Sequence, residues 1–163
     1  MCAEALVDLG DVNFYCHIVA KYQQAVEKLV KAVATALRPH GLAVHSIGYN
    51  HGVEKLIEMI AKLPRLRVLH DAQMHLASLF SPHHRAEIIA LSGLAPRRPA
   101  GGALHRRNTE YPFQTSQDQW TCPAMRGVFV KSEVERFGSL WKYLYRHASA
   151  LIDALPKAPH NIV

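Results

Sequence analysis

Residues 132–155 read SEVERFGSLWKYLYRHASALIDAL and show the clearest periodicity in the chain. Their apolar positions recur at intervals of three and four residues, which is the spacing of one face of an α-helix. These positions are Val134, Phe137, Trp141, Leu144, Ala148, Leu151 and Leu155. Ser132 and Glu135 stand at the spacing of a capping box. Because Pro156 and Pro159 follow, the pattern predicts a last amphipathic helix over 132–155.

Similar periods appear earlier in the chain. The segments that predict helices are 13–37, 53–63, 68–80 and, beginning at Pro82, 83–91. The first of them ends at Pro39 and Gly41, and the second ends at Pro64. No segment predicts a convincing strand. We therefore expect an all-α fold, an antiparallel bundle of four to five helices, formed as one domain over residues 1–163.

The segment before the last helix has a different composition. Residues 93–125 hold several Gly and Pro and no sustained period, which predicts a long irregular loop. We take 82–125 as a loop-rich insertion and 156–163 as a tail.

Composition narrows the class of protein. An apolar fraction of 49% excludes a disordered chain, and the lack of an 18-residue apolar run excludes a membrane span. The start MCAEALVDLGD is acidic and unlike a signal peptide, and three Cys without CxxC spacing suit a reducing compartment. We expect a cytoplasmic protein. Its net charge of +6 is compatible with a nucleic acid or nucleotide partner, and equally with an ordinary charged surface.

Positive charge is densest in residues 97–107, RRPAGGALHRR. The paired N–H groups of an arginine guanidinium match the spacing of phosphate oxygens, and the glycines would let a ligand approach the backbone. The candidate phosphate-binding residues here are Arg97, Arg98, His105, Arg106 and Arg107. The alternative is a solvated surface loop. No catalytic signature and no metal-ligand spacing stands out, since His70 and His75 are five positions apart, and we expect neither a metal nor a cofactor.

Residues 15–34, YCHIVAKYQQAVEKLVKAVA, carry the polar group Gln23, Gln24, Glu27 and Lys28 on an otherwise apolar helix. This segment resembles the second helix of HEPN domains (higher eukaryotes and prokaryotes nucleotide-binding), which has an aQQAvEKalKAl-like pattern. Two later positions continue the resemblance. His51-Gly52-Val53 stands where that family opens a helix with His-Asp-Leu, and Glu110-Tyr111-Pro112 stands near its Arg-Tyr-Pro turn.

The resemblance implies a nucleotide- or RNA-binding helical domain, acting as a homodimer. It also implies a toxin–antitoxin or nucleotidyltransferase-associated system, with the nucleotidyltransferase or antitoxin as a separate partner. Lys28, Arg107 and the arginine-rich loop would line a groove for a triphosphate. Residues placed at a groove or helix interface are Gln23, Gln24, Glu27, His51 and Tyr111.

Many HEPN proteins are metal-independent ribonucleases with an Arg-x4–6-His motif, in which Arg stabilises phosphate charge and His moves a proton. Three pairs have this spacing, Arg38/His45, Arg65/His70 and Arg98/His105, and about two are expected by chance. Arg65 and His70 lie in RLRVLHD, which is similar to a stretch of the toxin subclass, so they are the candidate catalytic pair. A structural interaction domain is the remaining alternative.

Overall fold

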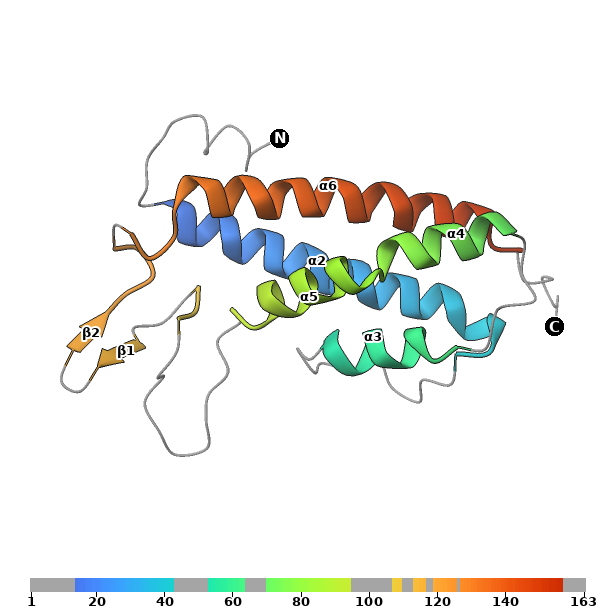
Figure 1. The fold of residues 1–163 in the computed structure, drawn as a ribbon, viewed down its shortest axis with the longest axis horizontal. Coiled ribbons are helices and arrows are strands. Elements are labelled where there is room, and N and C mark those ends of the chain that lie inside the picture. The colour runs from blue at the N-terminus through green and yellow to red at the C-terminus, as the bar shows by residue number, and fades with distance from the viewer. Residues whose placement is uncertain are drawn as a thin grey trace, which may run out of the picture.

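The computed structural model describes residues 14–42, 53–63, 70–94, 107–109, 113–116, 119–125 and 127–156. Within this part of the chain five α-helices pack together (Figure 1), which confirms the all-α prediction. They are α2 (Tyr15–Leu37), α3 (Val53–Ala61), α4 (His70–Leu79), α5 (Pro82–Ser92) and α6 (Lys131–Ala154). The short 3-10 helix η2 (Arg38–His40) ends α2, and Gly41 follows in a left-handed conformation with φ 99° that suits glycine.

The two long helices α2 and α6 lie against each other, and α4 lies along α6 (Figure 1). Contacts between α4–α5 and α6 join His75 to His147 and Glu87 to Arg136, so residue numbers rise in one and fall in the other. The α4–α5 unit is thus antiparallel to α6, as expected for neighbours in a bundle.

The predicted apolar face of α6 lies in the core of the bundle. Val134, Phe137, Leu144, Ala148 and Leu151 are all buried. On α2 most apolar positions of the same spacing are buried, together with positions beside them such as Val19 and Val30. Helical periodicity predicted these contacts because an amphipathic helix buries its apolar stripe against its neighbours.

The start of α6 differs from the prediction. The helix begins at Lys131, and the Glu133 carboxylate accepts a hydrogen bond from the Val130 backbone N–H at 3.1 Å. Glu133 therefore satisfies a backbone donor at the helix start in place of the predicted Ser132/Glu135 pair. The capping interaction is displaced because the N-cap is Val130, two residues before the Ser132 that the capping-box spacing predicted.

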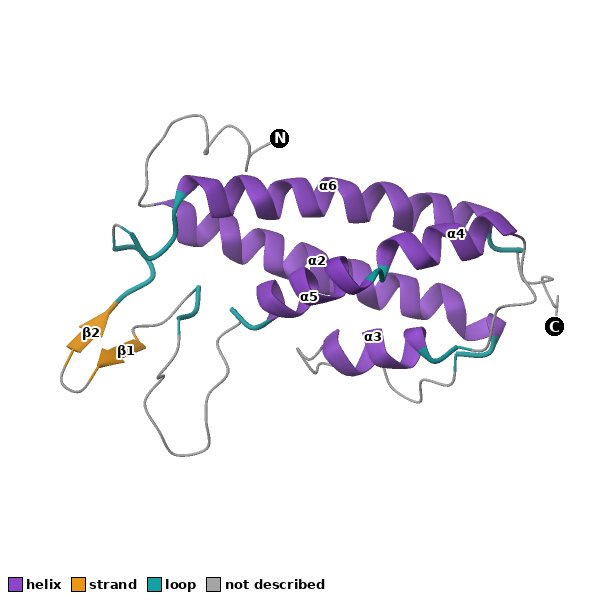
Figure 2. Ribbon diagram, in the orientation of Figure 1, coloured by secondary structure: helices purple, strands orange, loops and turns teal. Residues whose placement is uncertain are grey.

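The predicted loop-rich insertion at 82–125 contains ordered elements. Its first part is helix α5, and a small antiparallel pair, β1 (Phe113–Ser116) and β2 (Gln119–Thr121), lies further on (Figure 2). The expectation of no strand was wrong here, because strands of three and four residues are too short to show a period. No helix in the described ranges is long and apolar enough to cross a membrane.

Candidate functional site: the α4–α5 corner

Most of the residues proposed from sequence for phosphate binding or catalysis lie outside the described part of the chain. These are Arg65, Arg97, Arg98, His105 and Arg106. Two of the residues predicted to lie at a groove or helix interface, His51 and Tyr111, are also outside it. His70 is described only through its backbone, as the first residue of α4. The pairing of Arg65 with His70 and the arginine-rich loop therefore stay predictions.

Arg107 is the one residue of the arginine cluster that the structure describes. Its two terminal nitrogens donate to both carboxylate oxygens of Glu133 at 2.8 and 2.6 Å, and its guanidinium stacks on the Phe129 ring at 4.1 Å. The ion pair holds the pKa of the Glu133 carboxyl below its usual range. Arg107 thus links residues 107–109 to the start of α6, and both of its terminal nitrogens already donate to the Glu133 carboxylate.

Replacing Glu133 by glutamine should lower the free energy of unfolding by about 1 kcal/mol at pH 7, a figure discounted for partial exposure of the pair. The lowered pKa means that the stabilisation is present above the usual glutamate pKa of about 4.3. It is lost as the pH falls through the lower folded-state value. Urea denaturation at pH 7 and at pH 3 measures this. Glu135→Gln, on the exposed side of the same turn, is the control and should change little.

The polar residues of the QQAVEK stretch of α2 point in different directions. Gln23 and Glu27 are buried, joined by a 3.3 Å hydrogen bond, and Glu27 also pairs with Lys31 at 2.7 Å. Gln24 lines a small hollow beside Cys16 and Cys122, whereas Lys28 is exposed. Gln23 and Glu27 therefore serve the packing of α2, and the structure does not gather the whole group into one site.

A larger cavity of about 450 Å³ lies between α3, α4 and α5. Its walls are mainly apolar, and they are formed by Ile60, Ala61, Leu63, Leu76, Ala77, Phe80 and Pro82. Three polar side chains also line it, Gln73, Ser81 and Arg85, and no acidic side chain is among the described lining residues. An apolar cavity of this size with a few polar groups has the character of a small-ligand site.

Arg85 supplies the positive charge of the cavity. Its Nε donates to the backbone carbonyl of Phe80, at the end of α4. A guanidinium has five N–H donors. Since Nε uses one of them, the N–H groups of the two terminal nitrogens can donate to another acceptor. No carboxylate in the described ranges lies within ion-pair distance of Arg85. The cavity therefore presents a cation that no described acidic group neutralises.

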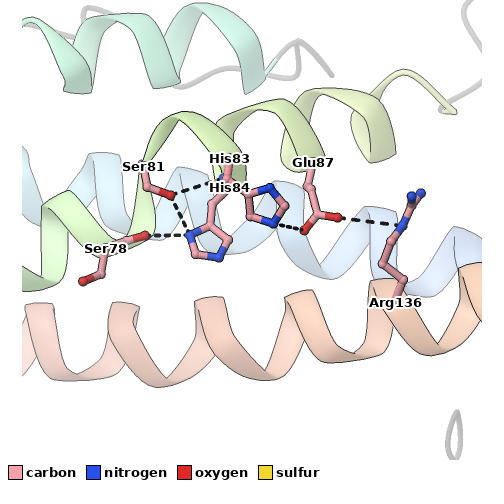
Figure 3. Close-up of polar contacts among 6 residues, drawn as sticks. All are labelled: Ser78, Ser81, His83, His84, Glu87 and Arg136. Carbon is pink, nitrogen blue, oxygen red and sulfur yellow. Dashed lines mark hydrogen bonds and ion pairs between the residues drawn. The ribbon is translucent and has the colours of Figure 1, made fainter.

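The corner between α4 and α5 is held by hydrogen bonds around His84 (Figure 3). Ser81 caps α5 by accepting from the His84 backbone N–H at 3.3 Å, and Pro82 occupies the first helical position. The His84 Nδ1 lies 2.9 Å from both the Ser81 hydroxyl and the Ser78 carbonyl. Because a carbonyl can only accept, Nδ1 carries the ring proton. This network holds the start of α5, the helix that carries Arg85.

The opposite side of the corner faces α6 with a row of aromatic rings. His84 stacks on Tyr143 with ring centroids 4.1 Å apart, and Tyr143 contacts His147 at 4.4 Å. His147 in turn lies 3.1 Å from His75, Nδ1 to Nδ1. Burial first, then the charges of His75, Arg146 and His84, lower the pKa of His147. The neutral form of the His147 imidazole is therefore favoured.

At the outer edge of the same interface, Glu87 on α5 lies between two positively charged or protonatable groups (Figure 3). It is 3.6 Å from the His83 ring and 3.8 Å from Arg136 on α6. His83 and Arg136 are mostly exposed, so these ion pairs contribute little stability. Across the described ranges no three His, Cys, Asp or Glu side chains gather as a metal site would require.

Sequence reasoning located the Ser81-Pro82 break but not the cavity beside it. Gln73 and Arg85 stand alone among ordinary helix residues, and neither belongs to a motif. The only available signal was a single Arg three positions after a helix-initiating Pro, which is common on exposed helices. Comparisons of this chain with family models, with curated proteins and with solved structures gave no match.

Proposed function

We propose that this helical domain binds a nucleotide, with the base in the cavity between α3, α4 and α5 and the phosphate on Arg85. The observation that carries the proposal is the guanidinium of Arg85, which lines an apolar cavity and has no ion-pair partner among the described side chains. The cavity walls suit a flat apolar ring, and the remaining guanidinium donors suit phosphate oxygens.

Two further features favour a nucleotide over a fatty-acid anion. Gln73 brings an amide to the cavity, and an amide can donate to and accept from the edge of a base. The likeness of residues 15–34 to a HEPN helix supports the same ligand class. Cleavage of RNA, association with a nucleotidyltransferase or antitoxin, a homodimer and a cytoplasmic location remain predictions of that resemblance.

Binding of adenosine and guanosine monophosphates, measured by calorimetry at pH 7.5, tests the proposal. Arg85→Gln should weaken binding by about tenfold or more, since a hydrogen bond to a charged group contributes about 1.5–3 kcal/mol. Ala77→Trp should abolish it by filling the cavity while leaving Arg85 in place. Ala77 is exposed at the rim, so the folded state tolerates the larger side chain.

Arg146→Gln is the matched control, because Arg146 carries the same charge, is exposed and does not line the cavity. It should bind the nucleotides as the wild type does. Octanoate represents the alternative ligand class, fatty-acid carboxylates. If octanoate binds and neither nucleotide does, the cavity is a carboxylate site and the proposal is wrong. Equal loss of affinity in Arg85→Gln and Arg146→Gln would also contradict it, since binding would then follow net charge alone.

A further inference from the structure

The contact between His75 on α4 and His147 on α6 depends on protonation. Their Nδ1 atoms lie 3.1 Å apart, so one ring must donate and the other must accept. When both rings are fully protonated, two N–H groups face each other and no acceptor remains. The pair can therefore hold α4 against α6 only while at least one imidazole is neutral.

The groups around the pair oppose a second proton. His84 from α5 and Arg146 on α6 both disfavour charge on His147, and burial acts in the same direction. Tyr143 of α6 lies between His84 and His147, and its ring contacts both imidazoles. On α4, the exposed Asp71 stands one turn before His75. No carboxylate in the described part of the chain forms an ion pair with either imidazole.

Helix α4 connects this pair to the proposed nucleotide site. Gln73, Leu76, Ala77 and Phe80 recur at helical spacing and line the cavity. His75 lies on a different side of the same helix, where it meets α6. One side of α4 lines the cavity and another contacts α6. Because α4 is short, a shift of α4 away from α6 must also move the cavity wall.

We propose that the His75–His147 pair is a proton-operated latch that keeps α4 on α6 and thereby keeps the nucleotide cavity in its binding shape. This inference rests on the proposed function for the ligand, but the latch itself is a property of the bundle. The direction follows from the depressed pKa of His147. Unfolded or released imidazoles take up protons at about pH 6.5, so the contribution of the pair to the docking of α4 is fully present above that pH. It is lost as the pH falls through the lower folded-state pKa of His147.

The experiment measures α4 docking and ligand binding separately at pH 7.5 and pH 5.5. Docking is read without ligand, as the hydrogen-exchange protection of α4 amides relative to those of α2. Binding is read with adenosine 5′-methylphosphate, whose single phosphodiester charge does not change over this range. In the wild type the protection of α4 should fall by more than about twofold at pH 5.5, and affinity should fall with it, because protonation of both rings removes the hydrogen bond between them.

His75→Asn is the decisive variant, because the asparagine amide can keep a hydrogen bond near the Nδ1 position without titrating. Its protection and its affinity should change less between the two pH values than those of the wild type, because the charge of the second imidazole no longer opposes protonation of His147. His147→Asn is the second variant and should behave in the same way if the first is poorly folded.

An equal fall in the wild type and both variants would overturn the latch, as would constant α4 protection in the wild type. A fall in protection without a fall in affinity would overturn its control of the cavity. If the probe fails to bind the wild type at pH 7.5, the proposed function fails. The latch would then be judged on α4 protection alone, with the asparagine variants as the comparison.

Discussion

Replacement of Leu144 by alanine is expected to lower the free energy of unfolding by about 3 kcal/mol, within the 2–5 kcal/mol typical of large-to-small changes in a core. Leu144 is 1% exposed and sits near the middle of α6, the helix that packs on both α2 and α4. Its removal takes away apolar burial and leaves a cavity that two helices on different sides cannot both close. For a domain with 5–15 kcal/mol of stability this is a large fraction.

The neighbouring residue supplies the control. Tyr145 is 57% exposed, so Tyr145→Ala should change the free energy of unfolding by less than about 1 kcal/mol. Chemical denaturation followed by circular dichroism measures both variants. Similar losses in the two variants would mean that α6 does not bury the face described here.

Gly138→Leu is the second change with a large expected effect. A Cβ at this position would lie 2.9 Å from the Tyr22 hydroxyl oxygen and 3.3 Å from its ring carbon Cζ. Tyr22 is buried on α2, so the ring has little room to move. A leucine would have to push α2 and α6 apart, and we expect a loss of about 3 kcal/mol, at the upper end for overpacked cores.

The cause can be isolated with a smaller substitution. Gly138→Ala should gain about 1 kcal/mol from helix propensity and lose a similar amount to the contact with Tyr22. In the Tyr22→Phe background the hydroxyl is gone, so the same alanine should become stabilising relative to that background. A double-mutant cycle measured by thermal denaturation gives the coupling between the two positions. Coupling indistinguishable from zero would show that the close approach does not limit position 138.

The candidate site was much less accessible to sequence reasoning than the fold. The arginine-rich segment drew attention because charge density is visible in a sequence, yet its described member, Arg107, pairs with Glu133 26 positions away. A sequence cannot show that a distant carboxylate already occupies a guanidinium. Arg85 carried no visible signal, since its importance comes from having no such partner at a cavity built by three helices.

The QQAVEK stretch shows the same limit from within one helix. Its spacing correctly places Gln23 and Glu27 one turn apart, and they are hydrogen-bonded. Whether that polar pair faces a ligand or the interior depends on which helix lies across from it. The structure buries both side chains.

The sequence by itself determined where the helices lie and which faces they bury, because helix periodicity, caps and prolines act between residues three or four positions apart. The Ser81-Pro82 break and the apolar stripe of α6 are both of this local kind. Only the tertiary structure decided which side chains meet. His75 and His147 are 72 positions apart, and their shared hydrogen bond exists because α4 packs on α6. The cavity around Arg85 likewise arises where three helices fail to fill the space between them, a property of their packing that no single segment encodes.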